Sequence, residues 1–299
     1  MSSQVNDPAL AQRTSMGYVY MALSATGVIF LPTTAKFALQ GGSDVLSVAF
    51  ARGIVATLIL LLVTLMLGLN LRLPRRQLLP SIVVGIAAAL FVYGIYRAIL
   101  TINISLALLI LFLYPLVIAT WEHVSGAARI RSAQWIWGFS ALAGLVMILG
   151  VRFDQISFVG VTMAGLAMFA SVVITLVNVR IVNTTGSLIA NLYMSLWTLL
   201  LFGAAILVFG QFSPPQTTLG WSGMLGNGVA YCVSWVAFFA GASILGATRA
   251  SMITLFEPVL AALVAWLIFG ETFSPLQWAG FALVLASLFM FEKLALAES

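Results

Sequence analysis

Ten apolar segments, each about as long as a membrane helix, occupy almost all of this 299-residue chain. A helix rises about 1.5 Å per residue, so roughly 20 apolar residues cross a hydrocarbon core of about 30 Å. Hydrophobic residues make up 62% of the chain and charged residues only 7%, which is too apolar for a soluble domain. The sequence therefore predicts an all-α integral membrane protein, with helices near residues 17–38, 45–69, 78–100, 103–121, 133–151, 157–180, 186–209, 221–244, 247–268 and 275–292.

Length decides how two parts of this pattern are interpreted, the boundary between the third and fourth segments and the nature of the first segment. Only Arg97 and Thr101-Ile102-Asn103 part the third segment from the fourth, but a merged segment of more than 40 residues is too long for one crossing. The stretch from Tyr18 to Phe37 follows a polar tail of residues 1–15 and is too long for a signal-peptide core, so we expect it to be a retained first helix.

The basic residues predict the orientation. With a cytoplasmic N-terminus, nine of them face the cytoplasm and three face the other side, which satisfies the positive-inside bias. Ten crossings then return the C-terminus to the cytoplasm. The nine are Arg13, Arg72, Arg75, Arg76, Arg129, Arg131, Arg180, Arg249 and Lys293; the three are Lys36, Arg97 and Arg152.

Similar residues recur at a spacing of 143 positions, which predicts two five-helix repeats, residues 16–152 and 153–299. Because five is odd, the second repeat enters the membrane from the opposite side. The charges agree, since arginines lie in connectors 72–76 and 129–131 whereas connectors 211–221 and 270–275 carry no Lys or Arg. The recurring pairs are Pro115 and Pro258, Gln134 and Gln277, Trp135 and Trp278, Gly85 and Gly228, Ala107 and Ala250, and Leu23 and Leu166.

Inverted repeats are typical of secondary transporters, because two similar halves can exchange conformations and open a central site to either side in turn. The alternative is an old duplication that is retained for packing alone.

Several short motifs resemble the EamA domain, the repeat unit of the drug/metabolite transporter superfamily. The second half carries Leu255-Phe256-Glu257-Pro258-Val259, Phe269-Gly270-Glu271, Ser274, Gln277 and Gly280; the first half carries Lys36, Phe50-Ala51-Arg52, Arg97-Ala98, Leu113-Tyr114-Pro115-Leu116, Gln134 and Gly138. The resemblance covers nearly the whole chain and is closest to ten-helix bacterial exporters. It implies efflux of amino acids, aromatic ones among them, or of related metabolites across the inner membrane.

Glu257 is the clearest candidate for chemistry. It lies well inside the ninth segment, directly before Pro258, where a charge costs about 2.5–3.5 kcal/mol on insertion scales. It is therefore either functional or a structural carboxylate that pairs with a neighbouring helix. Its mate at the 143-residue spacing is Tyr114, so the two halves place different polar groups at one depth.

Three basic residues, Lys36, Arg52 and Arg97, fall in the outer third of the predicted membrane. They either attract a carboxylate or extend to the interface.

Polar and aromatic residues also form helical stripes, which indicate either a ligand-holding cavity or hydrogen bonds between helices. The stripes are Asn227, Tyr231, Ser234, Trp235 and Phe238; Tyr93, Tyr96 and Arg97; and Ser171, Thr175 and Asn178. The predicted substrate-binding residues are Glu257, Tyr93, Tyr96, Tyr114, Asn178, Tyr231, Trp235, Thr33, Lys36 and Arg97, with helix bends at Pro115 and Pro258.

These features favour a metabolite exporter with alternating access. A sugar-phosphate or nucleotide-sugar antiporter of the same superfamily is the alternative, and it should show several cavity cations from both halves. One His, one Cys and one deep carboxylate are too few for an intramembrane enzyme, so we predict no enzymatic activity and no cofactor or metal. The predicted partners are a small solute and the lipid bilayer, without nucleic acid, for a chain that is monomeric.

Overall fold

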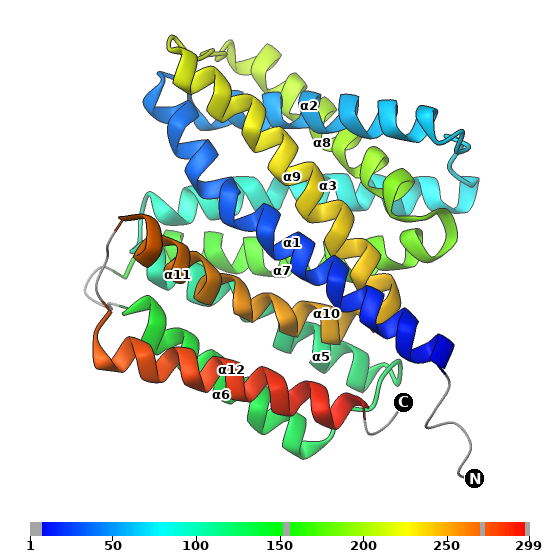
Figure 1. Ribbon diagram of the computed structural model, residues 1–299. Helices are drawn as coiled ribbons and strands as arrows, with labels where there is room; N and C mark the ends of the chain where they lie inside the picture. Colours follow the sequence, from blue (N-terminus) through cyan, green and yellow to red (C-terminus); the bar gives the residue numbers. More distant parts are fainter. Residues whose placement is uncertain (1–7, 152–155, 270–272, 297–299) are drawn as a thin grey trace. The chain divides into compact units, whose positions relative to one another are not determined.

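A computed structural model describes residues 8–151, 156–269 and 273–296, and α-helix dominates this part of the chain (Figure 1). Ten helical spans among these residues are long and apolar enough to cross a membrane, which confirms the predicted fold class. The elements are α1 (Pro8–Gln40), α2 (Val45–Met66), α3 (Arg75–Ile99), α4 (Ile104–Leu111), α5 (Tyr114–Val124), α6 (Ser132–Leu149), α7 (Phe158–Thr185), α8 (Ser187–Phe209), α9 (Thr218–Leu245), α10 (Ala247–Ile253), the 3₁₀ helix η1 (Thr254–Phe256), α11 (Glu257–Phe269) and α12 (Pro275–Leu296).

The third and fourth spans are separate helices, as predicted. α3 ends at Ile99, and α4 begins at Ile104. The Asn103 side chain accepts a hydrogen bond of 2.9 Å from the Ser105 amide, which caps the new helix. A polar cap in this short connector therefore ends what would otherwise be one very long apolar run.

Large apolar side chains lie exposed along the membrane helices. In α2, Leu58, Leu62 and Leu65 are each more than half exposed, at a spacing that puts them on one helix face. Soluble proteins rarely expose such a continuous apolar face, whereas lipid covers one at no cost. This pattern agrees with a multi-pass membrane protein.

The chain divides into two compact units, and each is described by itself. Unit 1 contains residues 1–86 and 177–250, and unit 2 contains residues 87–176 and 251–299. Each unit thus takes helices from both halves of the sequence. The divisions fall inside α3, α7 and α10, so each of these three helices contributes one end to each unit.

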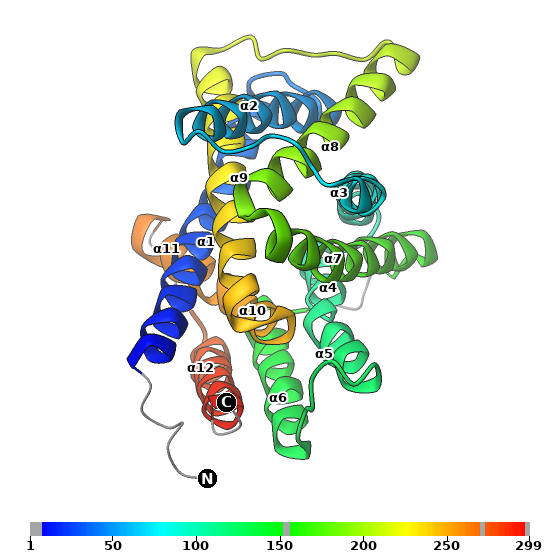
Figure 2. The ribbon, with the colours of Figure 1, turned by 90° about the vertical axis from the view of Figure 1, so that its right-hand side faces the viewer.

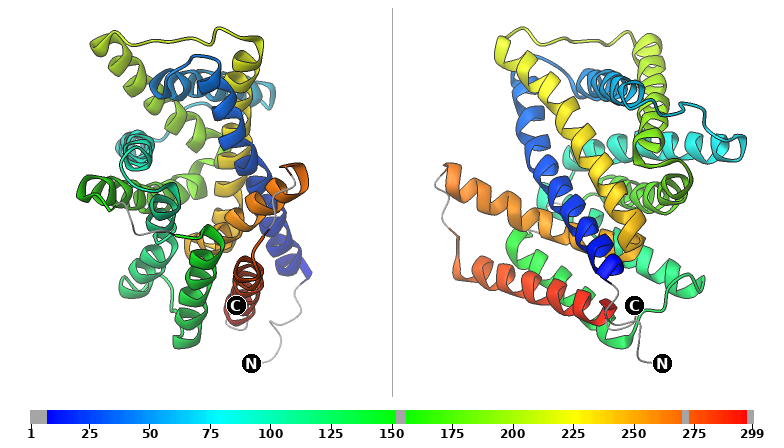
Figure 3. Two further views of the ribbon diagram at one scale, coloured as in Figure 1. Left: turned by 90° about the vertical axis from the view of Figure 1, so that its left-hand side faces the viewer. Right: turned by 45° about the vertical axis from the view of Figure 1, so that its right-hand side comes forward.

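In unit 1, α1 and α9 run side by side over most of their length (Figure 3). They approach closely because small residues line the contact: a Cβ on Gly223 would lie 2.6 Å from the Thr34 carbonyl oxygen. The Asn227 amide nitrogen donates to the Leu31 carbonyl oxygen at 2.9 Å and to Thr34 Oγ1 at 3.1 Å. α2 packs against both α8 and α9.

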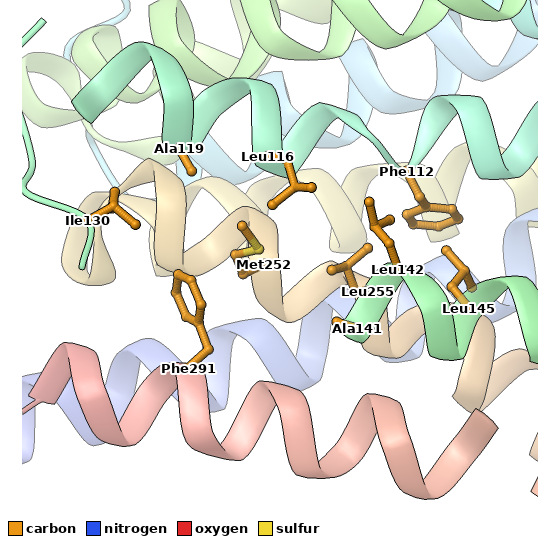
Figure 4. Packing of buried hydrophobic residues seen from close by; sticks show 10 residues of the cluster. All are labelled: Phe112, Leu116, Ala119, Ile130, Ala141, Leu142, Leu145, Met252, Leu255 and Phe291. Carbon is orange, nitrogen blue, oxygen red and sulfur yellow. The ribbon is translucent and has the colours of Figure 1, made fainter. Parts of the chain in front are cut away.

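In unit 2, α6 and α12 pack along each other (Figure 2), and the core lies between them and the fourth and ninth spans. Figure 4 shows Phe112 and Leu116 facing Met252 and Leu255, with side chains of α6 and α12 beneath them. Unit 2 therefore holds its two broken spans together through an apolar core.

Both of these spans are interrupted. The fourth span stops at Leu111 and resumes at Tyr114 as α5, and the ninth passes through η1 before α11 begins at Glu257. Pro115 and Pro258 follow the two interruptions, and a proline has no amide hydrogen to bond the preceding turn. The helices that follow the two interruptions begin 143 residues apart. The hinge role of the interruptions stays a prediction.

Candidate functional site

A hydrogen bond joins the interruptions of the fourth and ninth spans in unit 2. The Tyr114 hydroxyl lies 2.6 Å from Thr254 Oγ1. Thr254 donates its only hydroxyl hydrogen to the Ser251 carbonyl oxygen at 2.7 Å, so Tyr114 is the donor in the bond between them. The Tyr114 oxygen therefore keeps its lone pairs, and it can accept a hydrogen bond from a third group.

Glu257 lies one helical turn after Thr254 and within electrostatic range of the Tyr114 hydroxyl. Its side chain is partly buried. Its carboxylate makes no hydrogen bond to any residue among those that the structure describes, so nothing there offsets the cost of a charge in the membrane. We refer to Tyr114, Thr254 and Glu257 as the helix-break cluster.

The aromatic groups of α9 form a second cluster, in unit 1. The Arg52 guanidinium lies over the ring of Tyr231, with its carbon 4.7 Å from the ring centroid. The rings of Tyr231 and Trp235 are 5.7 Å apart, and Phe238 and Phe239 extend the group beyond Trp235. We refer to Arg52, Tyr231 and Trp235 as the arginine–aromatic cluster. The Arg52 cation therefore contacts one end of a row of aromatic rings.

Several polar atoms of unit 1 are buried and have no hydrogen-bond partner in the described residues. Asn178 is fully buried, with both its amide nitrogen and its amide oxygen unpartnered. Asn191 Oδ1 and Ser195 Oγ, one turn apart on α8, are unpartnered as well. Buried polar atoms are nearly always bonded, so these positions suit bound water or a polar solute.

The α9 stripe that the sequence predicts serves two purposes. Asn227 and Ser234 bond to α1, Ser234 through the Ser24 carbonyl oxygen at 3.2 Å. These two residues therefore fulfil the structural alternative, hydrogen bonding between helices. Tyr231 and Trp235 instead belong to the arginine–aromatic cluster.

The other predicted site residues belong to neither cluster. In unit 1, Thr33 is partly buried on α1 and Lys36 is exposed. In unit 2, Tyr93 and Arg97 are exposed on α3, one turn apart, and Tyr96 is partly buried. Gly270 and Glu271 of the family motif, and Arg152, lie outside the described residues.

Sequence reasoning missed Thr254 and Ser195. Thr254 lies three residues before Glu257, which places it on the same helix face. Ser195 lies 143 residues after Arg52, at the matching position of the second half. The sequence shows both spacings, but it does not show that Thr254 meets Tyr114 or that Ser195 lies beside Tyr231.

Residues 158–292 match the model of the EamA-like transporter family, so an EamA-like transporter domain is present in the second half. Twenty-nine chains of known structure are similar to this one. One of them, described only as "Crystal structure of protein", shares 18% sequence identity and a TM-score of 0.78, over 95% of this chain and 98% of its own. At this identity the likeness concerns the fold alone. The comparison with curated proteins found no match.

Proposed function

We propose that this multi-pass membrane protein, with its EamA-like transporter domain, is a secondary transporter that exports aromatic or other amphipathic amino acids, or related metabolites, across the bacterial inner membrane. The matched domain is consistent with a membrane transporter. The short motifs resemble those of ten-helix bacterial exporters, the branch that includes the aromatic amino-acid exporter YddG, and this resemblance supports the choice of solute.

One observation carries this proposal: Glu257 stands at a helix interruption inside the ninth span without a hydrogen-bond partner in the described residues. An ammonium group would supply both the missing charge and the missing donors. A protonated Glu257 could instead donate to the free lone pairs of Tyr114, which would let the residue carry a coupling proton. Both roles fit an exporter of zwitterionic solutes.

Alternating access follows from the predicted inverted repeat. Two similar five-helix halves can exchange conformations, and the paired interruptions before Pro115 and Pro258 are weak points at which each half can bend. The repeat boundaries at residues 16–152 and 153–299 and the cytoplasmic location of both termini form part of this proposal.

Counterflow in proteoliposomes tests the solute class. Vesicles loaded with an unlabelled solute should accumulate labelled tryptophan or phenylalanine, and sugar phosphates should neither drive nor inhibit this exchange. Exchange of sugar phosphates alone would contradict the proposal and favour the antiporter alternative.

Glu257→Gln separates the two roles. If Glu257 binds the solute ammonium, the variant should weaken apparent affinity at least about tenfold without a pH gradient, as expected for a lost charged hydrogen bond. If Glu257 carries the proton, counterflow should persist while the response to an imposed gradient disappears. Glu122→Gln removes a carboxylate at the end of α5 and should change neither property. Unchanged affinity and unchanged gradient response in folded Glu257→Gln would exclude both roles.

A further inference from the structure

Arg52 lacks a protein carboxylate within the described part of unit 1. The only described acidic residue of that unit is Asp44, eight positions earlier and so about 12 Å away along the helix. Asp44 already accepts hydrogen bonds from the Ser47 amide at 2.8 Å and from the Ser47 hydroxyl at 3.0 Å. Among the described residues of unit 1, only the ring of Tyr231 therefore offsets the Arg52 charge.

An aromatic ring satisfies a guanidinium only in part. The ring attracts the face of the cation, whereas the five N–H donors lie in the guanidinium plane and point past it. No described residue of unit 1 accepts a hydrogen bond from them. Arg52 is thus a fixed cation with open donors, and a planar carboxylate is the group that matches its geometry best.

Ser195 supplies a second donor beside the same ring. The Tyr231 hydroxyl lies next to the Ser195 side chain, but the Ser195 hydroxyl lacks a well-formed hydrogen bond to any described residue and is almost fully buried. Because Ser195 is the mate of Arg52 at the 143-residue spacing, α2 and α8 bring matching positions to Tyr231. The unpartnered hydroxyl is an observation independent of the charge on Arg52.

We propose that Arg52, Ser195 and Tyr231 form a carboxylate-binding subsite in unit 1, with the Trp235 ring as the contact for the apolar part of the ligand. The chemistry favours an aromatic or aliphatic monocarboxylate. A phosphate dianion would require further cations, and the other basic residues of unit 1 lie near helix ends or in connectors. Only the statement that this carboxylate belongs to the transported solute rests on the proposed function.

Binding to the purified full-length protein tests the subsite without any transport step. The probes are indole-3-propionate and its neutral amide, which has the same shape but no charge, and the readout is the thermal shift over a concentration series. Wild-type protein should bind the acid at least about tenfold more tightly than the amide, because charge-assisted hydrogen bonds to arginine are lost with the amide. Arg52→Gln should remove that preference and leave amide binding unchanged.

Three further variants keep the test decisive. Arg52→Lys retains the charge without the planar donors and should preserve part of the preference even if Arg52→Gln folds poorly. Ser195→Ala should lower acid binding a few-fold. Arg76→Gln removes one arginine from the exposed start of α3 and should match wild type.

Equal binding of acid and amide by wild-type protein would overturn the subsite, as would a preference that survives in folded Arg52→Gln. Amino-acid counterflow, measured in parallel, separates this outcome from failure of the proposed function. A protein that binds the acid through Arg52 but exchanges no amino acid keeps the subsite and loses the proposed solute class.

Discussion

Positions that correspond at the 143-residue spacing are alike at two helix contacts and unlike at the polar groups of the two proposed sites. Gly85 on α3 packs against Trp197 on α8, and Gly228 on α9 packs against Val55 on α2. In the first contact the glycine lies on α3 and its neighbour on α8, and in the second the glycine lies on α9 and its neighbour on α2. In contrast, the spacing pairs Arg52 in unit 1 with a serine, and Glu257 in unit 2 with a tyrosine.

The starts of α6 and α12 also correspond at this spacing, and they form the same type of hydrogen bond. The Gln134 side-chain oxygen accepts a hydrogen bond of 2.9 Å from the Arg131 amide at the start of α6. Gln277 accepts one of the same length from the Ser274 amide at the start of α12. Backbone requirements are the same in both halves, whereas an asymmetric solute requires a different group at each end. Similar helix geometry with different polar groups in the two halves is therefore consistent with the proposed zwitterionic solute.

The largest effect should come from adding a methyl group at either glycine contact. In Gly85→Ala the new Cβ would collide with Trp197, and in Gly228→Ala with Val55. We expect each variant to lose about 1–3 kcal/mol of stability through overpacking. Fluorescence-detected size-exclusion chromatography after heating would measure both losses.

Gly165→Ala is the matched control, because no described residue lies within 4 Å of its added Cβ and alanine favours a helix. A large loss in one contact variant together with wild-type behaviour in the other would show that the two contacts are not equivalent.

Next in size is the effect of removing the prolines at the two interruptions. Pro115→Ala and Pro258→Ala restore a backbone donor and should stiffen their spans. We expect the transport rate to fall roughly tenfold in each, a change of about 1.4 kcal/mol in barrier height, while membrane insertion is unaffected. Pro80→Ala should transport normally, because α3 continues unbroken past Pro80. Normal transport by both interruption variants would remove the hinge role.

The sequence was sufficient for the fold, because ten apolar runs leave few alternatives and short polar connectors such as Asn103 mark the ends. It also singled out Glu257, since a carboxylate deep in a membrane span is costly. It could not separate the α9 stripe into Asn227, which bonds to α1, and Tyr231, which faces Arg52. Both lie on one helix face, and only the neighbouring helices decide which role each takes.

The hydrogen bond in the helix-break cluster should have a smaller effect than the prolines. Tyr114→Phe and Thr254→Val each remove one hydroxyl with little change of shape, and each should cost about 1 kcal/mol, or roughly fivefold in transport. If the bond couples the two interruptions, the double variant should lose no more than either single variant. Additive losses would mean that the two spans move independently, which would weaken the comparison between the halves.

The smallest effect concerns the starts of α2 and α8, which correspond at the 143-residue spacing. α2 is capped by Asp44, whereas α8 begins after Gly186 without a side-chain cap. Partial burial alone would raise the pKa of Asp44, but hydrogen bonds from Ser47, together with smaller contributions from Ser213 and Leu46, outweigh it and hold the pKa below its usual value. Asp44 lies in the connector before α2, where buffer reaches it.

A lowered pKa means that ionised Asp44 stabilises the folded state fully above the usual aspartate value, near pH 4, and that this contribution is lost as the pH falls through the lower folded value. We expect a loss of about 0.5–1 kcal/mol at the first turn of α2, the size of one helix cap. Hydrogen exchange corrected for its intrinsic rate should show faster opening there in acid, with the first turn of α8 unchanged. Asp44→Asn keeps a capping oxygen but cannot titrate, so its first turn should open equally at both pH values. Acid-dependent opening that persists in Asp44→Asn would assign the effect to another group and leave the two helix starts equivalent.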